Sequence, residues 1–302
     1  MRTAVIYDDI FLKHDLPTHP ENALRLKYFL KSLPEFNIPV LKPKNVSYDI
    51  LRAVHFENYI EDVRISCREN APGFFDPDTY YGEYTFDVAL MAAGAVEMGV
   101  ELLLSGKLRS VFCAVRPPGH HAEKGRAMGF CIFNNVAVGA VKALSLGAQR
   151  VFIVDFDAHH GNGTQHIFEN TPEVFYFSTH QYPFYPGTGS TKENRSNVLN
   201  VPMKEGTGDA EFQKAYGETY RKAVKSFSPD IILVSAGYDL HRDDPLAGLE
   251  VTDSGIEYII TQILESAEEL KIPVLFSLEG GYNLYALERC GRITFRKLAE
   301  FS

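Results

Sequence analysis

The segment from Val151 to Gly163 reads VFIVDFDAHHGNG and indicates the type of fold. It opens with β-branched and aromatic residues, which are typical of a strand covered on both faces of a parallel sheet. Because side chains alternate along a strand, Asp155, Asp157 and His159 are expected to project to the same side if the strand continues. Polar groups at the end of such a strand mark the crevice where open parallel sheets bind ligands.

Further strands and amphipathic helices alternate around this segment. Strands are expected at Thr3–Tyr7, Ser110–Ala114, Arg150–Phe156, Val174–Ser178, Ile231–Ala236 and Val274–Leu278. Helical periodicity occurs in Glu21–Ser32, Phe86–Leu104, Asn134–Leu146, Ala210–Ser226, Gly255–Leu270 and Leu284–Leu298. This alternation predicts an α/β fold with a mostly parallel central sheet and helices on both faces. We expect residues 1–302 to form one domain, because no repeat or linker-like stretch interrupts the pattern.

The polar residues after the first strand predict a metal site. Carboxylates that share one face at a buried strand end repel one another and lose solvation, and a bound cation resolves both problems. Asp with neutral His suits zinc, and a catalytic zinc site keeps three protein ligands. Asp239, at the end of IILVSAGYD, is the expected third ligand. Alternatively, Asp157 caps a helix that starts near Gly163, which leaves Asp155 unexplained, and Asp239 is an ordinary N-cap or turn residue.

Two other strand ends carry groups suited to proton transfer and oxyanion binding. The segment 110–122, SVFCAVRPPGHHA, places His120 and His121 after a rigid turn. Metal-assisted hydrolysis needs a base for water and an acid for the leaving amine, and histidine suits both roles. The pair could instead bind metal or lie exposed. The segment LEGGYN ends another strand, where the Tyr282 hydroxyl could donate to a developing oxyanion or simply pack in a loop.

The composition limits the classes of partner. Hydrophobic residues make up 45% and charged residues 23% of the chain, as in ordinary globular proteins. A net charge of -9 gives no general basis for nucleic-acid binding and suits cationic partners. The four cysteines form no C-x-x-C pair, so a reducing compartment such as the cytoplasm is expected. No apolar run approaches the roughly 20 residues needed to span a bilayer, so no membrane partner is expected.

Taken together, five segments resemble the zinc-dependent histone deacetylase family and its arginase–deacetylase fold. They are RPPGHHAEKGRAMGFCIFNNVAVGA, VDFDAHHGNGTQHIF, FSTHQYPFYPGTG, SAGYDLHRDDPLAGLEVT and LEGGYN, in the family's order and spacing. The sequences of these segments resemble class II members and bacterial relatives more than class I members. The resemblance implies a single-domain, three-layer fold that hydrolyses N-acyl, typically acetyl, amides with one catalytic Zn²⁺. It also implies an acyl-lysine peptide or protein, or a small acylated amine, as substrate.

The resemblance also assigns catalytic residues. The zinc ligands would be Asp157, His159 and Asp239. The catalytic groups would be His120, His121 and Tyr282, with Asp155 partnering the first histidine and Asn162 the second. Class I members carry Asp at the position of Asn162. A neutral Asn should leave His121 less basic than an Asp would, which favours the proton-donor role.

Substrate and monovalent-ion sites follow from the same resemblance. Substrate would contact Phe130, Tyr185, Asp78, Leu246 and Gly129, where Tyr185 stands in place of the family's usual Phe. A structural K⁺ or Na⁺ would be held by Asp155, Asp157, Ser178 and the carbonyls of His159 and Thr179. A second monovalent site would lie near Phe168 and Thr171.

Three alternative functions fit parts of the pattern. An arginase-like ureohydrolase would need carboxylates for a second metal where this chain has Gly161 and His241. An acetylpolyamine deacetylase would be expected to carry an acidic residue after Asp244-Pro245, where Leu246 stands, although dimer loops can also set that selectivity. A non-catalytic acyl-lysine binding module would not need the full catalytic set. The compact length fits a bacterial or archaeal enzyme, while the acyl length, the substrate amine, the oligomeric state and the orientation of His241 stay open.

Overall fold

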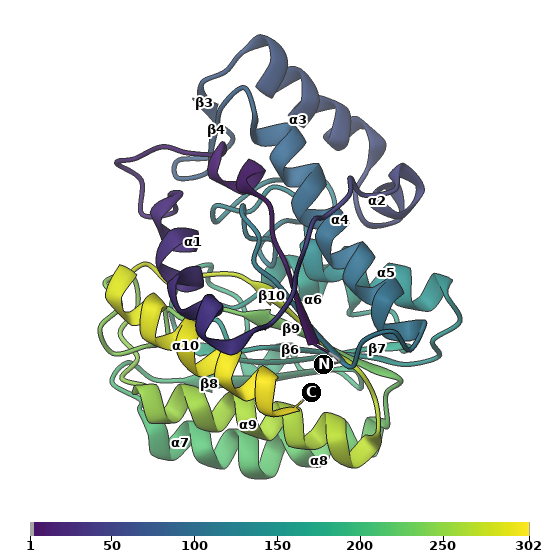
Figure 1. Ribbon diagram of the computed structural model, residues 1–302, viewed down its shortest axis with the longest axis vertical. Helices are drawn as coiled ribbons and strands as arrows, with labels where there is room; N and C mark the ends of the chain where they lie inside the picture. The colour runs from purple at the N-terminus through teal and green to yellow at the C-terminus, as the bar shows by residue number, and fades with distance from the viewer. Residues whose placement is uncertain (1–2, 302) are drawn as a thin grey trace.

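The computed structural model describes residues 3–301 and is organised around an eight-stranded parallel sheet with the order β2-β1-β5-β10-β9-β6-β7-β8 (Figure 1). Its strands are β1 (Thr3–Ile6), β2 (Val40–Leu41), β5 (Ser110–Cys113), β6 (Val151–Asp155), β7 (Val174–Gln181), β8 (Val198–Met203), β9 (Ile231–Ala236) and β10 (Val274–Leu278). A separate antiparallel hairpin pairs β3 (Gly73–Phe74) with β4 (Tyr80–Tyr81). The predicted α/β class is confirmed.

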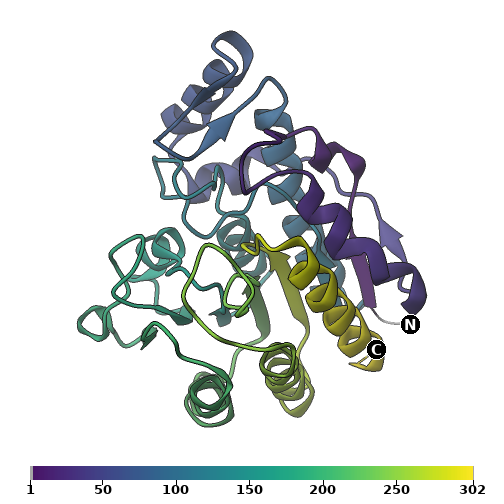
Figure 2. The same ribbon diagram turned by 90° about the vertical axis from the view of Figure 1, so that its left-hand side faces the viewer.

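Helices cover both faces of the sheet. On one face, α4 (Thr85–Leu104) contacts β5 and β10, and α5 (Asn135–Ser145) contacts β6 and β9. On the other face, α10 (Leu284–Phe301) contacts β1 and packs beside α9 (Asp253–Leu270). The helical run α7 (Asp209–Lys214), η4 (Ala215–Tyr220) and α8 (Arg221–Phe227) packs against α9, and Figure 2 shows this lower layer edge-on.

The remaining helices flank these layers or connect their elements. They are η1 (Asp9–Leu12), α1 (Leu24–Phe29), η2 (Leu30–Phe36), α2 (Tyr48–Val54), α3 (Glu57–Glu69), α6 (Asn162–Phe168) and η3 (Thr191–Glu193). Both α1 and η2 pack on α10. Among the helices within residues 3–301, none combines the length and the apolar character required to cross a membrane.

The central strands bring their following residues to one edge of the sheet. Every residue of β5, β6, β9 and β10 is buried, as their continuous apolar runs predict. In the register, Asp155 at the end of β6 stands opposite Ser235 of β9 and Ser178 of β7. Because all these strands are parallel, the segments that carry the predicted site residues leave the sheet side by side.

The predicted elements are present with shifted ends, and several short elements were not predicted. The helix expected at Glu21–Ser32 is shorter, because α1 gives way to the 3₁₀ turn η2, which contains Pro34. Strands β2 and β8 and helices α2 and α3 were not predicted. Strand β2 has only two residues, and β8 contains Asn200 and Pro202, which weaken a strand pattern but are tolerated at an edge.

A buried ion cluster fixes the segment before α1 against the sheet edge. The Glu21 carboxylate is fully buried and accepts hydrogen bonds from Arg116 Nη2 (2.7 Å) and Arg25 Nη1 (2.9 Å). Burial acts to raise the pKa of Glu21, but the guanidinium groups of Arg116 and Arg25 outweigh it and lower this pKa to about 2. Arg25 Nε also donates to the carbonyl of Gly281 at 2.6 Å, so the cluster ties the segment after β10 to the rest of the fold.

We expect Glu21→Gln to lower the free energy of unfolding by roughly 3–5 kcal/mol, because two buried guanidinium groups lose their charged partner. The folded pKa of Glu21 lies below the unfolded value of about 4.3. Its stabilisation is therefore complete above about pH 4.3 and is lost as pH falls toward about 2. Unfolding with guanidinium chloride should be measured for wild type and variant at several pH values. The difference in their free energy of unfolding should be constant near neutrality and shrink below about pH 4. The control Glu35→Gln removes an exposed partner of Arg292 and should cost at most about 1 kcal/mol. Equal losses in both variants would contradict the role of the cluster.

Candidate active site

The three predicted metal ligands gather beyond the ends of β6 and β9. One ligand atom each from Asp157, His159 and Asp239 lies within 4.8 Å of the others. His159 Nδ1 is 2.9 Å from Asp239 Oδ2 and 3.2 Å from Asp157 Oδ1. Both carboxylates are buried, whereas the imidazole is partly exposed. The structure therefore places a nitrogen and two carboxylate oxygens where one ion could be bound.

Neither aspartate acts as a helix cap. The N-cap of α6 is Gly161, and no side chain caps that helix. Asp157 instead accepts hydrogen bonds from the backbone N–H of His159 (2.9 Å) and of Gly280 (2.8 Å). Asp239 Oδ1 accepts one from Ala158 N–H (2.8 Å). These bonds hold both carboxylates toward the shared centre, so the capping alternatives are wrong.

The shape and charge of this cluster fit a bound cation. A Cβ atom at Gly237 would lie 2.0 Å from Asp157 Oδ2, and one at Gly280 would lie 2.3 Å from Asp239 Oδ2. Glycine is therefore required at both places for the backbone to enclose the carboxylates. Burial raises the pKa of Asp239, and the negative charge of Asp157 raises it further. A positive ion would relieve this repulsion, and two carboxylates with one imidazole form a donor set suited to zinc.

Asp155 does not point where strand alternation predicts but faces His120, the partner that the resemblance implies. Its Oδ2 atom lies 3.0 Å from His120 Nδ1 and accepts a hydrogen bond from the Tyr176 hydroxyl, also at 3.0 Å. Strand β6 ends at Asp155, so the alternation of a strand does not continue to His159. The expectation that Asp155, Asp157 and His159 share one side is therefore wrong for Asp155, which lies behind His120.

The two histidines are adjacent but have different environments. Their ring centroids are 4.0 Å apart, and both side chains are buried. Burial lowers the pKa of His120, but the carboxylates of Asp157 and Asp155 outweigh it and raise this pKa to about 10. The pKa of His121 falls well below its usual value because of burial and then the charges of His120 and His159. The hydrogen bond with Asn162 acts in the opposite direction and raises this pKa, so the low basicity of His121 comes from burial and its neighbouring histidines and not from Asn162.

One pocket of about 260 Å³ collects the predicted substrate residues. Its lining comprises Asp78, His121, Gly129, Phe130, His159, Phe184, Tyr185, Leu246 and Tyr282. The rings of Phe130 and Tyr282 meet edge to face at 5.6 Å, and those of Tyr185 and His121 at 5.3 Å. Gly129 has a φ of +55°, and a Cβ there would lie 2.5 Å from His121 Cδ2. A side chain at Gly129 would therefore displace the imidazole.

Arg25 and Asp244, to which the sequence analysis assigned no role, hold the loop of Tyr282. The Arg25 guanidinium lies over the Tyr282 ring, 4.8 Å from its centroid. Asp244 Oδ2 accepts hydrogen bonds from the backbone N–H of Tyr282 (2.6 Å) and Asn283 (3.1 Å), and its Oδ1 accepts one from Leu246 N–H (3.0 Å). Asp244 thus joins the two loops that carry Leu246 and Tyr282 into the pocket.

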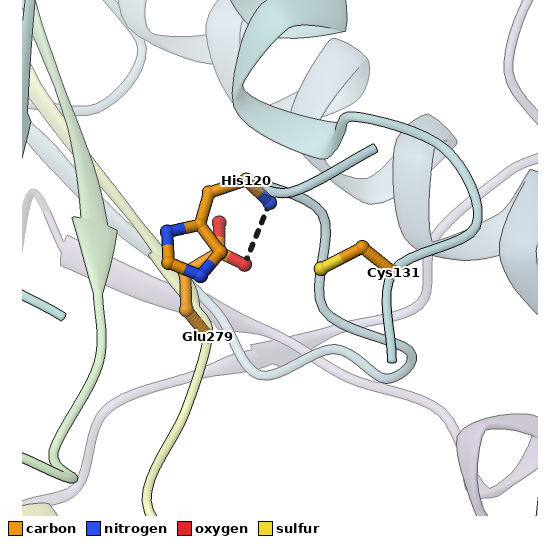
Figure 3. A group of neighbouring side chains, drawn as sticks. All are labelled: His120, Cys131 and Glu279. Atoms are coloured by element: carbon orange, nitrogen blue, oxygen red, sulfur yellow. Dashed lines mark hydrogen bonds between the residues drawn. The ribbon is translucent and has the colours of Figure 1, made fainter. Parts of the chain in front are cut away.

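A second group of neighbouring side chains consists of His120, Cys131 and Glu279 (Figure 3). Glu279 Oε2 accepts hydrogen bonds from the backbone N–H of Gly119 (2.7 Å) and His120 (3.1 Å). Cys131 Sγ donates to the carbonyl of Gly129 at 3.3 Å, and burial raises the pKa of this thiol well above its usual value. We therefore interpret this cluster as a support for the backbone of His120. Sequence reasoning missed Glu279, although it stands within LEGGYN.

The remaining predicted residues belong to the two monovalent-ion sites. The Ser178 hydroxyl is 2.8 Å from His180 Nδ1, and Thr179 Oγ1 is 3.0 Å from the Tyr216 hydroxyl. The carbonyls of Phe168 and Thr171 both accept hydrogen bonds from Asn197 Nδ2, at 2.9 and 3.0 Å. The monovalent-ion sites stay predictions.

The orientation of His241 is defined by its hydrogen-bond partners. His241 Nε2 lies 2.9 Å from Asp253 Oδ1, and its Nδ1 accepts a hydrogen bond from Asp243 N–H at 3.1 Å. Both ring nitrogens are thus engaged by groups outside the cluster of Asp157, His159 and Asp239.

Comparison with known proteins places the chain in a family. Residues 19–298 match the family described as histone deacetylase domain. A "Probable deacetylase" of Archaeoglobus fulgidus is 36% identical over 94% of this chain and 82% of its own length. "Histone deacetylase 15" of Arabidopsis thaliana is 37% identical over 94% of this chain and 54% of its own length. The crystal structure of the HDA15 HD domain superposes with a TM-score of 0.93 at 34% identity, covering 98% of this chain and 90% of that one. This chain therefore belongs to the histone deacetylase family.

Proposed function

We propose that this protein is a zinc-dependent deacylase that hydrolyses N-acyl amides, with acyl-lysine as the main substrate class and acetyl as the main acyl group. The observation that carries the proposal is the single pocket into which His121, His159 and Tyr282 all project. A metal ligand, a proton-transfer group and a hydroxyl donor around one narrow cavity are what amide hydrolysis requires. The aromatic walls Phe130 and Tyr185 suit the aliphatic stem of an acylated amine.

In this proposal Asp157, His159 and Asp239 hold the zinc ion. When bound there, zinc would polarise the acyl carbonyl and lower the pKa of the attacking water. His121 lines the pocket with its Nδ1 held by Asn162 Oδ1, so its Nε2 accepts the proton of that water and later delivers it to the leaving amine. His120 stays protonated between Asp155 and Asp157 and stabilises negative charge. The Tyr282 hydroxyl donates a hydrogen bond to the developing oxyanion.

An acetylpolyamine is the alternative substrate class. Asp78 lines the pocket, and Asp76 in the same loop accepts the backbone N–H of Asp78 at 3.2 Å. Two carboxylates near the mouth would attract any cationic amine. Against a polyamine, Leu246 in the lining is apolar and cannot pair with a second ammonium group. Lysine in a peptide chain needs no such partner, which favours acyl-lysine.

The substrate class can be tested by turnover of the purified, zinc-loaded protein. We expect a higher kcat/KM on an acetyl-lysine peptide than on N-acetylputrescine or N-acetylspermidine. A preference for the polyamines would contradict the role of Leu246. If the zinc-loaded protein turned over none of these three substrates, and no peptide with a longer acyl-lysine either, the proposed function would be contradicted.

Tyr282→Phe should lower kcat by about 10²–10³-fold, the usual effect of removing one oxyanion donor. Zinc content should stay at the wild-type level, because Tyr282 is not among the proposed ligands. Tyr285→Phe is the matched control, since Tyr285 is 69% exposed and lies three residues away. Steady-state kinetics and metal analysis of both variants check this prediction. Near-normal turnover in Tyr282→Phe would remove the hydroxyl from the mechanism.

Asp157→Ala should lose zinc, because one of three proposed ligands is removed and Asp239 and His159 cannot hold the ion alone. Elemental analysis after dialysis should find about one zinc per chain in wild type and far less in the variant. Asp49→Ala, which changes an aspartate with a 96% exposed side chain, should retain wild-type zinc. Full occupancy in Asp157→Ala would exclude Asp157 as a ligand.

A further inference from the structure

The two active-site histidines have chemically different partners. His120 Nδ1 faces the carboxylate of Asp155, which can only accept a hydrogen bond while it is charged. His121 Nδ1 faces the side-chain amide of Asn162, with the oxygen Oδ1 at 2.8 Å. An amide carries both an acceptor oxygen and a donor NH₂ group, so Asn162 could in principle present either one to His121. Something else must determine which one it presents.

The surroundings of the Asn162 NH₂ group determine this orientation. Asn162 Nδ2 donates to Glu123 Oε1 at 2.6 Å, and two further acceptors, the His121 carbonyl and Met128 Sδ, each lie 3.4 Å away. None of these three atoms carries a hydrogen. If the amide were flipped, Asn162 Oδ1 would face the Glu123 carboxylate without any hydrogen between the two oxygens. The flip is therefore excluded while Glu123 is charged.

The orientation of Asn162 fixes the tautomer of His121. Because Oδ1 can only accept, His121 Nδ1 must carry the hydrogen. The neutral ring then has a bare Nε2, and the imidazole lines the substrate pocket. That is the tautomer needed to take a proton from water at Nε2. With a flipped Asn162, the hydrogen would sit on Nε2 and the base would be lost.

Glu123 itself is held in place by its backbone and by a histidine. Its N–H donates to the carbonyl of Arg126 (2.9 Å), and His55 Nδ1 lies 2.9 Å from its carbonyl. The same Oε1 atom that accepts from Asn162 lies 2.8 Å from His166 Nδ1. Its side chain is 19% exposed, so its charge is only partly screened by water. The carboxylate is thus fixed on the outer side of Asn162.

We propose that Glu123 is a positioning residue for catalysis, which acts through Asn162 to hold His121 in the Nδ1–H tautomer. The proposal rests on the proposed function only for its kinetic consequence, because the tautomer can be observed without turnover. Glu123 supplies the negative charge that Asn162 lacks, one hydrogen bond further from the imidazole. The neutral amide of Asn162 can therefore hold His121 in this tautomer, a role that would otherwise require a carboxylate at that position.

The tautomer is measured by long-range ¹H–¹⁵N correlation on zinc-loaded protein labelled at histidine nitrogen, with His121→Gln used to assign the signals. Wild type should show a protonated Nδ1 and a bare Nε2 at His121. Glu123→Ala should shift the ring toward the Nε2–H form or a mixture. An unchanged His121 spectrum in folded Glu123→Ala would overturn the proposal, even if the protein deacylated no substrate.

Kinetics on the acetyl-lysine peptide provide the second test. Glu123→Ala should lower kcat about tenfold with KM changed less than about twofold, a fraction of the 10²–10⁴ that a general base contributes. Glu123→Gln keeps an acceptor oxygen and should recover most of kcat. Glu169→Gln, a surface carboxylate partnered by Arg195, is the matched control and should match wild type. A rise in KM without a fall in kcat would count against a positioning role. So would a loss of kcat that is equal in Glu123→Gln and Glu123→Ala.

A double variant separates positioning from a structural contribution. In the Asn162→Asp background the carboxylate accepts from His121 Nδ1 in either orientation, so Glu123 is no longer needed to set the tautomer. The second oxygen of the introduced carboxylate would face Glu123 without a hydrogen between them, so removing Glu123 also relieves a repulsion there. Glu123→Ala should then cost less than about twofold in kcat, against about tenfold in the Asn162 protein. Equal costs in both backgrounds would mean that Glu123 acts only on the fold. If wild type is inactive on every substrate tested, the proposed function fails, while the nitrogen spectra still decide the role of Glu123.

Discussion

Four carboxylates, those of Asp155, Asp157, Asp239 and Glu279, share the carboxyl edge of one parallel sheet and are almost completely buried. Charges in such a place are costly unless each has a specific partner. Asp155 faces His120, and Glu279 accepts two backbone N–H groups and the Ser235 hydroxyl. Asp157 and Asp239 face each other across a gap that glycine backbones enclose, and a cation is the partner that would satisfy both. The requirement to neutralise this edge determines most of the local structure.

The same requirement extends to the loop that closes the pocket. Glu21 is charged and buried because Arg116 and Arg25 surround it, and Arg25 then reaches the Gly281 carbonyl and the Tyr282 ring. Arg25 therefore connects a structural ion cluster with the proposed oxyanion donor. A buried guanidinium has five donors in a rigid plane, so it can fix several groups at once, which a lysine could not do.

Strands that depend on a short run of neighbouring residues were predicted from the sequence. Side-chain directions and long-range contacts, which depend on where a strand ends or a loop turns, were not. Strands β6, β9 and β10 were predicted because apolar runs of that length have few alternatives. The resemblance grouped Asp157, His159 and Asp239, which the structure brings together, and assigned Tyr282, which lines the same pocket as His159. Strand alternation gave the wrong direction for Asp155, because β6 ends at that residue, whereas the resemblance had assigned Asp155 to His120, which it faces. Arg25 gave no signal either, since its partners Glu279 and Gly281 are distant in sequence and a buried arginine in a helix has the same pattern as an exposed one.

The contrast between the two histidines follows from these partners. His120 lies against carboxylates that favour its charged form, while burial and the charges of His120 and His159 disfavour the charged form of His121, whose partner Asn162 is only an amide. Adjacent groups with opposite protonation preferences can hold one positive charge and one lone pair at the same time, which two equivalent histidines could not do. Replacing a carboxylate by Asn162 helps to create this difference, because no full negative charge touches His121. The amide has a weakness, its freedom to flip, and Glu123 lies at the one position from which a charge can remove that freedom without reaching the imidazole.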